Sequence, residues 1–210
     1  CLGLDDTLFD SRQSVRSGLR AAAALVESET GEMVEEELSR AYADKDDKVR
    51  AFESVLDTHD LSVDAGRLVD AFHHPTDGLD PHPAAPRVLA ELDSRYELGL
   101  LTTRRNGCAT LDALGFTDVF DAVVVVHGDN WKRKRESFER ILKGLRTRPQ
   151  AAVHVSAEPD AAFPTANELG MHTVRLVRNR HDERERRDDD ADRHVVSLRE
   201  IPDVVRSLDN

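Results

Sequence analysis

Short, continuous apolar runs alternate with helical patterns from residue 85 to the end of the chain. The expected strands cover residues 98–102, 122–126, 152–155, 173–177 and 194–198. The helical patterns cover residues 88–96, 108–114, 137–145, 160–169 and 202–208. Strands that are apolar on both faces and are separated by helices are typical of a parallel sheet covered on both sides. This alternation predicts an α/β fold built on a doubly wound parallel sheet.

The segment before residue 80 has a different pattern. It contains no strand-like run, and its apolar residues recur at three- and four-residue spacing in four stretches: 14–29, 33–42, 48–58 and 62–72. That spacing is typical of amphipathic helices. A proline-rich stretch follows over residues 75–86 and predicts the return of the chain to the sheet. We therefore expect an all-helical insertion, residues 12–80, in an α/β core of residues 1–11 and 81–210.

The charge of the chain excludes several classes of partner. Its 210 residues include 41 acidic and 29 basic side chains, which gives a net charge of −12. Such a surface repels nucleic acid and anionic membranes, and no apolar run is long enough to span a bilayer. We expect a cytoplasmic protein, with a few residues before Cys1. Because only five of the basic residues are lysine, we also expect a halophilic protein.

Four segments resemble the motifs of one enzyme superfamily. The first segment, Leu2-Gly3-Leu4-Asp5-Asp6-Thr7-Leu8, resembles the first motif of the haloacid dehalogenase (HAD) superfamily, Asp-x-Asp-[Asp/Gly]-Thr-Leu. Residues 98–103 resemble the second motif, residues 132–138 the third, and residues 155–174 the fourth. The chain is identified as a member of the HAD superfamily with degenerate motifs. This resemblance implies a Rossmann-like core with a helical cap.

The resemblance also implies which positions carry chemistry. In HAD phosphohydrolases the first Asp of motif one attacks phosphorus, the second acts as general acid and base, and Mg²⁺ is bound beside them. Asp5 stands at the acid/base position. Thr102 and Lys132 stand at the phosphate-binding positions, and Arg104 and Arg105 follow the second-motif strand as further candidate anion contacts.

The sequence departs from the family pattern at the catalytic acids. Gly3 stands at the nucleophile position. The fourth motif, Gly-Asp-Ser-x-x-x-Asp, aligns with residues 156–162, which places Ser156 at the Gly and Ala157 and Ala162 at the two acids. Losing the nucleophile lowers the hydrolysis rate by many powers of ten. Because the two acids that would bind the metal are also replaced by alanine, we expect no resident metal. If Glu158 or Asp160 binds Mg²⁺ from a shifted backbone, Mg²⁺ would be the cofactor.

Several functions agree with this pattern. The first is a catalytically inactive or strongly impaired HAD protein, whose pocket either binds a phosphate or phospho-ligand or is an empty vestige. The second is an active Mg²⁺-dependent phosphatase with a rearranged metal site. The third is a scaffold that acts through the cap on an unidentified protein partner. The basic run of residues 132–135 is interpreted as a solvated loop rather than a nucleic-acid patch.

Overall fold

The computed structural model describes the chain in six stretches: residues 1–44, 47–73, 78–126, 131–158, 162–178 and 190–208. The chain divides into two compact units. The first contains residues 1–10 and 80–210, and the second is the segment Ser11–Leu79. Each unit is described by itself.

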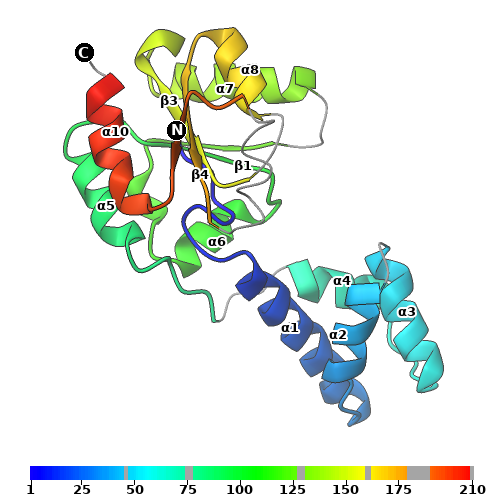
Figure 1. Cartoon of the computed structure of the whole chain (residues 1–210). Coiled ribbons are helices and arrows are strands. Elements are labelled where there is room, and N and C mark those ends of the chain that lie inside the picture. Colours follow the sequence, from blue (N-terminus) through cyan, green and yellow to red (C-terminus); the bar gives the residue numbers. More distant parts are fainter. Residues whose placement is uncertain (45–46, 74–77, 127–130, 159–161, 179–189, 209–210) are drawn as a thin grey trace. The chain divides into compact units, whose positions relative to one another are not determined.

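The first unit contains a parallel sheet. Its strands are β1 (Gly99–Thr102), β2 (Ala122–Val125), β3 (Val153–Ser156), β4 (His172–Leu176) and β5 (Arg193–Val195). β1 pairs with β2, and β4 lies between β3 and β5, all in parallel. Leu2 joins the two groups because it bridges Leu100 on one side and Val155 on the other. The residues near the N-terminus therefore lie at the centre of the sheet, which confirms the predicted α/β fold (Figure 1).

Helices cover the sheet of the first unit. They are α5 (Ala85–Asp93), α6 (Gly107–Ala113), α7 (Trp131–Gly144), α8 (Ala162–Leu169) and α10 (Ile201–Leu208). Helices α7 and α8 pack against each other, as do α5 and α10 (Figure 1). Helix α7 approaches β1 closely because Gly99 has no side chain. A Cβ there would lie 2.8 Å from the Cδ1 of Ile141.

Two segments form a different kind of structure from the one expected from the sequence. Helix α7 begins at Trp131, so the basic run of residues 132–135 forms its first turns, and its interpretation as a solvated loop is wrong. The predicted strand 194–198 ends at Val195 instead. Its continuation is replaced by a capping box, in which Ser197 accepts a hydrogen bond from the Arg199 N–H and Glu200 accepts one from the Ser197 N–H. Local side-chain hydrogen bonds therefore compete with the strand ladder here.

The second unit contains four helices: α1 (Arg12–Thr30), α2 (Glu35–Asp44), α3 (Lys48–Thr58) and α4 (Ala65–His73). Their apolar faces share one core, which includes Leu38, Phe52 and Leu68. Helices α1 and α4 pack closely because Gly18 has no side chain, and a Cβ there would lie 2.4 Å from the Phe72 carbonyl oxygen. None of the helices in the described stretches has the length and apolarity to cross a bilayer.

The chain leaves and re-enters the first unit at one place. Phe9 forms a bridge with Pro81, and the Leu8 carbonyl accepts a hydrogen bond of 2.7 Å from the His82 N–H. The two ends of the helical insertion are thereby fixed to each other within the first unit.

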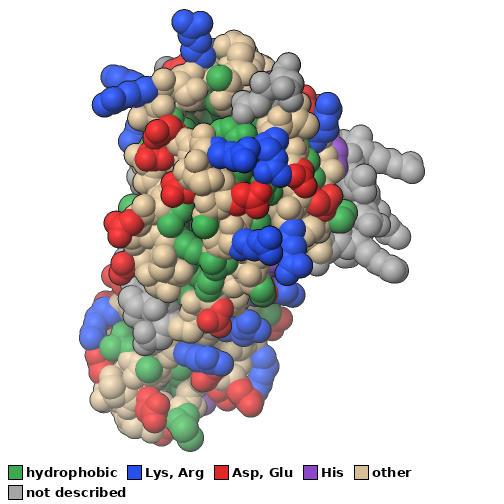
Figure 2. Space-filling model, turned by 90° about the vertical axis from the view of Figure 1, so that its left-hand side faces the viewer, with side chains coloured by type: hydrophobic (Ala, Val, Ile, Leu, Met, Phe, Trp, Pro, Cys, Tyr) green, Lys and Arg blue, Asp and Glu red, His purple; other side chains and the backbone are tan. Residues whose placement is uncertain are grey.

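On the surface, the face drawn in Figure 2 carries basic and acidic side chains that are interspersed rather than separated into patches.

Candidate functional site

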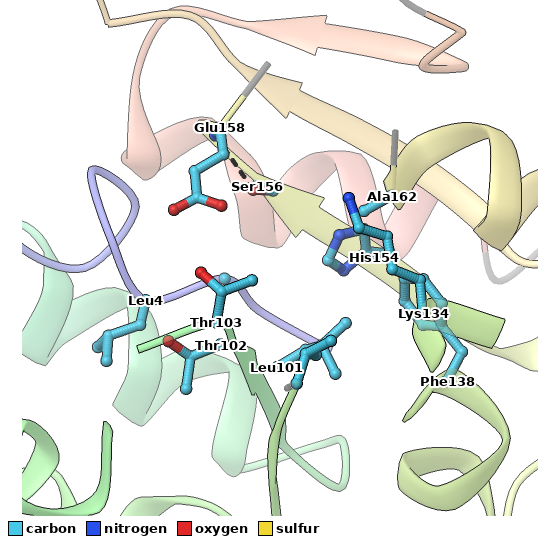
Figure 3. A pocket seen from close by; sticks show the side chains of 12 residues that line it. Leu4, Leu101, Thr102, Thr103, Lys134, Phe138, His154, Ser156, Glu158 and Ala162 are labelled. Carbon is cyan, nitrogen blue, oxygen red and sulfur yellow. Dashed lines mark hydrogen bonds between the residues drawn. The ribbon is translucent and has the colours of Figure 1, made fainter. Parts of the chain in front are cut away.

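A cavity opens at the carboxyl ends of the central strands of the first unit, where ligands bind in open α/β sheets (Figure 3). Its wall is built from the segment after Leu2, the end of β1, the first turns of α7, β3 and the start of α8. Thr102, Thr103, Lys134, Ser156 and Glu158 supply polar side chains to the lining. This is the place where the sequence predicts the family's reaction site.

Gly3, which the motif alignment places at the nucleophile position, is held in the sheet and lines the cavity. Its N–H donates a hydrogen bond of 2.8 Å to the Val155 carbonyl. A Cβ at Gly3 would lie 3.0 Å from the Ser156 Oγ and 3.2 Å from the Thr7 Oγ1. The atoms nearest to a side chain at position 3 are therefore the two hydroxyl oxygens of Ser156 and Thr7.

The loop after Gly3 is held by side chains from other elements. Asp6 adopts the left-handed conformation, with φ of 53°. The guanidinium of Arg178 donates hydrogen bonds to the carbonyl oxygens of Asp6 and Thr7. Thr7 is fully buried; its hydroxyl donates to the Asp5 carbonyl at 3.3 Å and accepts the Ala157 N–H at 2.9 Å. The loop is thus fixed to the ends of β3 and β4.

The carboxylate of Asp5 forms an ion pair with Arg104. The Arg104 Nε lies 3.0 Å from the Asp5 Oδ1, and the Arg104 Nη2 donates to the same oxygen. Only 12% of the Asp5 side chain and 20% of the Arg104 side chain are exposed. Neither residue is part of the cavity lining, and the same holds for the exposed Arg105. Arg104, predicted as an anion contact of the cavity, therefore pairs with Asp5, the residue that the motif alignment places at the acid/base position.

The buried cation of the described lining is Lys134, which the sequence analysis missed. It lies on α7, is only 8% exposed, and lines the cavity together with Thr102. The side chain of Lys132, the expected phosphate ligand, lies outside the described residues. Helical spacing could have identified Lys134, because residues four apart share one face of a helix and Phe138 faces the core.

The described lining offers few carboxylates for Mg²⁺. This ion prefers oxygen ligands in near-octahedral geometry and is usually bound by one or two carboxylates together with water. Ala157 is buried and Ala162 lines the cavity, while Asp160 lies outside the described residues. Glu158 is the one carboxylate among the described lining residues, and the described stretches hold no group of three or more His, Cys, Asp or Glu that could bind a metal.

No family model matches the chain. In sequence it is similar to glyceraldehyde 3-phosphate phosphatases of two archaea. The protein of Methanocaldococcus jannaschii is 28% identical and that of Methanopyrus kandleri 29% identical, and each match covers 98% of this chain and 95% of the relative.

Solved structures share the fold. A HAD phosphatase from Thermococcus onnurineus is 20% identical with a TM-score of 0.61, and the match covers 97% of this chain and 95% of that one. An L-2-haloacid dehalogenase from Xanthobacter autotrophicus is 21% identical with a TM-score of 0.65. The match covers 98% of this chain and 97% of the dehalogenase chain. The chain therefore has the HAD fold, with a Rossmann-like core and a helical cap.

Proposed function

We propose that the chain is a HAD-superfamily phosphatase relative that binds the phosphoryl group of a small ligand without hydrolysing it. The proposal rests on Gly3. A glycine supplies no nucleophile to attack phosphorus, and the neighbouring space is bounded by the hydroxyls of Ser156 and Thr7. Position 3 lacks the aspartate with which the covalent step of HAD phosphatases begins.

The charges around the cavity support metal-independent binding. A bound phosphate would be repelled by a cluster of carboxylates unless a metal ion offsets their charge. Here the Asp5 carboxylate is paired with Arg104, and in the described lining the positive charge of Lys134 offsets the negative charge of Glu158, so the lining is close to neutral. The hydroxyls of Thr102 and Thr103 add hydrogen-bond donors. An anion can therefore be held without Mg²⁺.

The names of two relatives support a chemical class for the ligand. Two archaeal relatives that match almost the whole chain are named glyceraldehyde 3-phosphate phosphatases. A small phosphorylated carbohydrate such as glyceraldehyde 3-phosphate is therefore the ligand that we propose for this cavity.

Calorimetric titration with inorganic phosphate, in the presence of a chelator, tests the proposal. Wild type should bind phosphate, and Thr102→Val should weaken binding about tenfold because a hydrogen bond to an anion is lost. Thr117→Val is the matched control, since Thr117 lies on the short helix η1 (Thr117–Val119), outside the cavity lining. Its phosphate affinity should equal that of wild type.

A phosphate-release assay with glyceraldehyde 3-phosphate and Mg²⁺ separates the alternatives. We expect no release. Release that disappears with chelator would instead establish a phosphatase with a rearranged metal site. Absence of phosphate binding would leave a vestigial cavity, and with it the hypothesis that the helical insertion acts on a protein partner.

A further inference from the structure

A histidine at the floor of the cavity has no function in the family pattern described above. His154 lies on β3, is 2% exposed and lines the cavity. Its ring packs between two phenylalanines, with centroid distances of 5.0 Å to Phe138 and 5.7 Å to Phe163. Neither ring nitrogen has a hydrogen-bond partner among the described residues. An apolar ring would fit these surroundings better than an imidazole.

The unpartnered nitrogens indicate that something else binds there. A buried polar group without a partner costs about 1–3 kcal/mol, and most such groups in proteins are satisfied by protein, water or ligand. Burial lowers the pKa of His154 to about 3, so the ring is neutral. A neutral imidazole offers one N–H donor and one nitrogen acceptor, which suits a hydroxyl or carbonyl oxygen.

Lys134 is the second polar group at this end of the cavity. Figure 3 shows its side chain beside His154, whereas Thr102 and Thr103 lie on the other side of the opening. His154 and Ser156 are two residues apart on β3, so they point to the same face of the sheet. The cavity thus has a hydroxyl-lined end and a histidine-lysine end.

We propose that His154 and Lys134 form a second recognition point, which binds a hydroxyl or carbonyl oxygen of the ligand whose phosphoryl group lies at the Thr102 end. This inference rests on the proposed binding function. It predicts that the cavity prefers a phosphate ester with a further oxygen function over a plain alkyl phosphate of equal length.

Titration with three ligands tests the proposal: inorganic phosphate, glycerol 3-phosphate and propyl phosphate. Wild type should bind glycerol 3-phosphate about fivefold to tenfold more tightly than propyl phosphate, the effect of one hydrogen bond. His154→Phe should remove this preference and leave the affinity for inorganic phosphate unchanged. His172→Phe is the matched control, because His172 lies outside the cavity lining on β4, and it should keep the preference.

The outcomes separate the two proposals. If wild type does not bind inorganic phosphate, the proposed function fails and this inference fails with it. If wild type binds phosphate but has no preference, or if His154→Phe keeps the preference, only the recognition point is overturned. His154→Leu repeats the test should the phenylalanine variant not fold.

Discussion

The hydroxyl of Ser156 borders the space that a side chain on Gly3 would enter, with Oγ 3.0 Å from the position of a Cβ at residue 3. The motif alignment places Gly3 where HAD enzymes have an aspartate and Ser156 where they have a glycine. In this predicted alignment the larger residue of the two lies at position 156 rather than at position 3. A side chain introduced at position 3 therefore has to compete with Ser156 for the same space.

Gly3→Asp should destabilise the protein by about 1–3 kcal/mol, because the new side chain meets the hydroxyls of Ser156 and Thr7. Ser156→Gly should relieve part of that cost. Urea unfolding of wild type, both single variants and the double variant forms a cycle that isolates the coupling between the two positions. Purely additive effects would contradict the close approach.

A triple variant should be stabilised against thermal unfolding by Mg²⁺. It combines Gly3→Asp, Ser156→Gly and Ala157→Asp. Two carboxylates placed close together repel each other, and Mg²⁺ relieves this repulsion by binding the folded state. At a Mg²⁺ concentration about one hundred times Kd the gain is about 2.7 kcal/mol. Thermal unfolding with and without Mg²⁺ measures it, with wild type as the control. If Mg²⁺ affects the triple variant and wild type equally, the motif alignment is wrong.

Arg104→Ala should destabilise the protein by about 1–3 kcal/mol, since it leaves the mostly buried Asp5 carboxylate without its ion-pair partner. Arg105→Ala is the matched control, because the next side chain along the chain is exposed and its loss should change the free energy of unfolding by less than about 0.5 kcal/mol. Urea unfolding measures both variants. Equal effects would show that the Asp5–Arg104 pair contributes nothing specific.

The stability of wild type should fall as the pH falls from about 6.5 toward 3. Burial lowers the pKa of His154 to about 3 in the folded state, while its ordinary value is 6.5. In this window the unfolded chain binds a proton that the folded chain does not, so acid favours unfolding. Between about pH 8 and about pH 5 this contribution amounts to about 2 kcal/mol.

His154→Phe lacks the titrating ring and should lose less stability than wild type over the same interval. Urea unfolding of both proteins at the two pH values measures the difference. Equal losses would mean that His154 is not held neutral in the folded protein.

The melting temperature should rise between about 0.1 M and about 2 M KCl. With 41 acidic and 29 basic residues the folded chain repels itself, and concentrated salt shortens the range of that repulsion to about 3 Å. Calorimetric scans at several KCl concentrations measure the change. An unchanged melting temperature would remove the inference that the protein is adapted to salt.

The order of strands and helices in the first unit could be predicted because its signals are local. A β-branched run such as residues 122–126 predicts a strand from a few neighbouring residues alone. The start of α7 could not be predicted from the sequence, because its first turns are strongly charged and lack the apolar spacing that is typical of a helix. There the aliphatic stem of Lys134 is buried although its charge suggests a solvated residue.

The candidate site was only partly predictable for a different reason. Thr102 and Gly3 are found from the motifs alone, because motif positions are fixed by short spacing along the chain. The pair of Asp5 and Arg104 joins residues 99 positions apart, and nothing local to either residue indicates the other. His154 is hidden for the same reason, since its two aromatic neighbours belong to α7 and α8.

The bridge between Phe9 and Pro81 makes the helical segment a removable module. Because the Leu8 carbonyl and the His82 N–H already close the chain on itself, residues 11–79 form a loop whose ends need no other support to meet. If a short glycine linker replaced residues 11–79, the entropic cost of closing this loop would be small. We therefore expect a chain shortened in this way to keep the same parallel sheet.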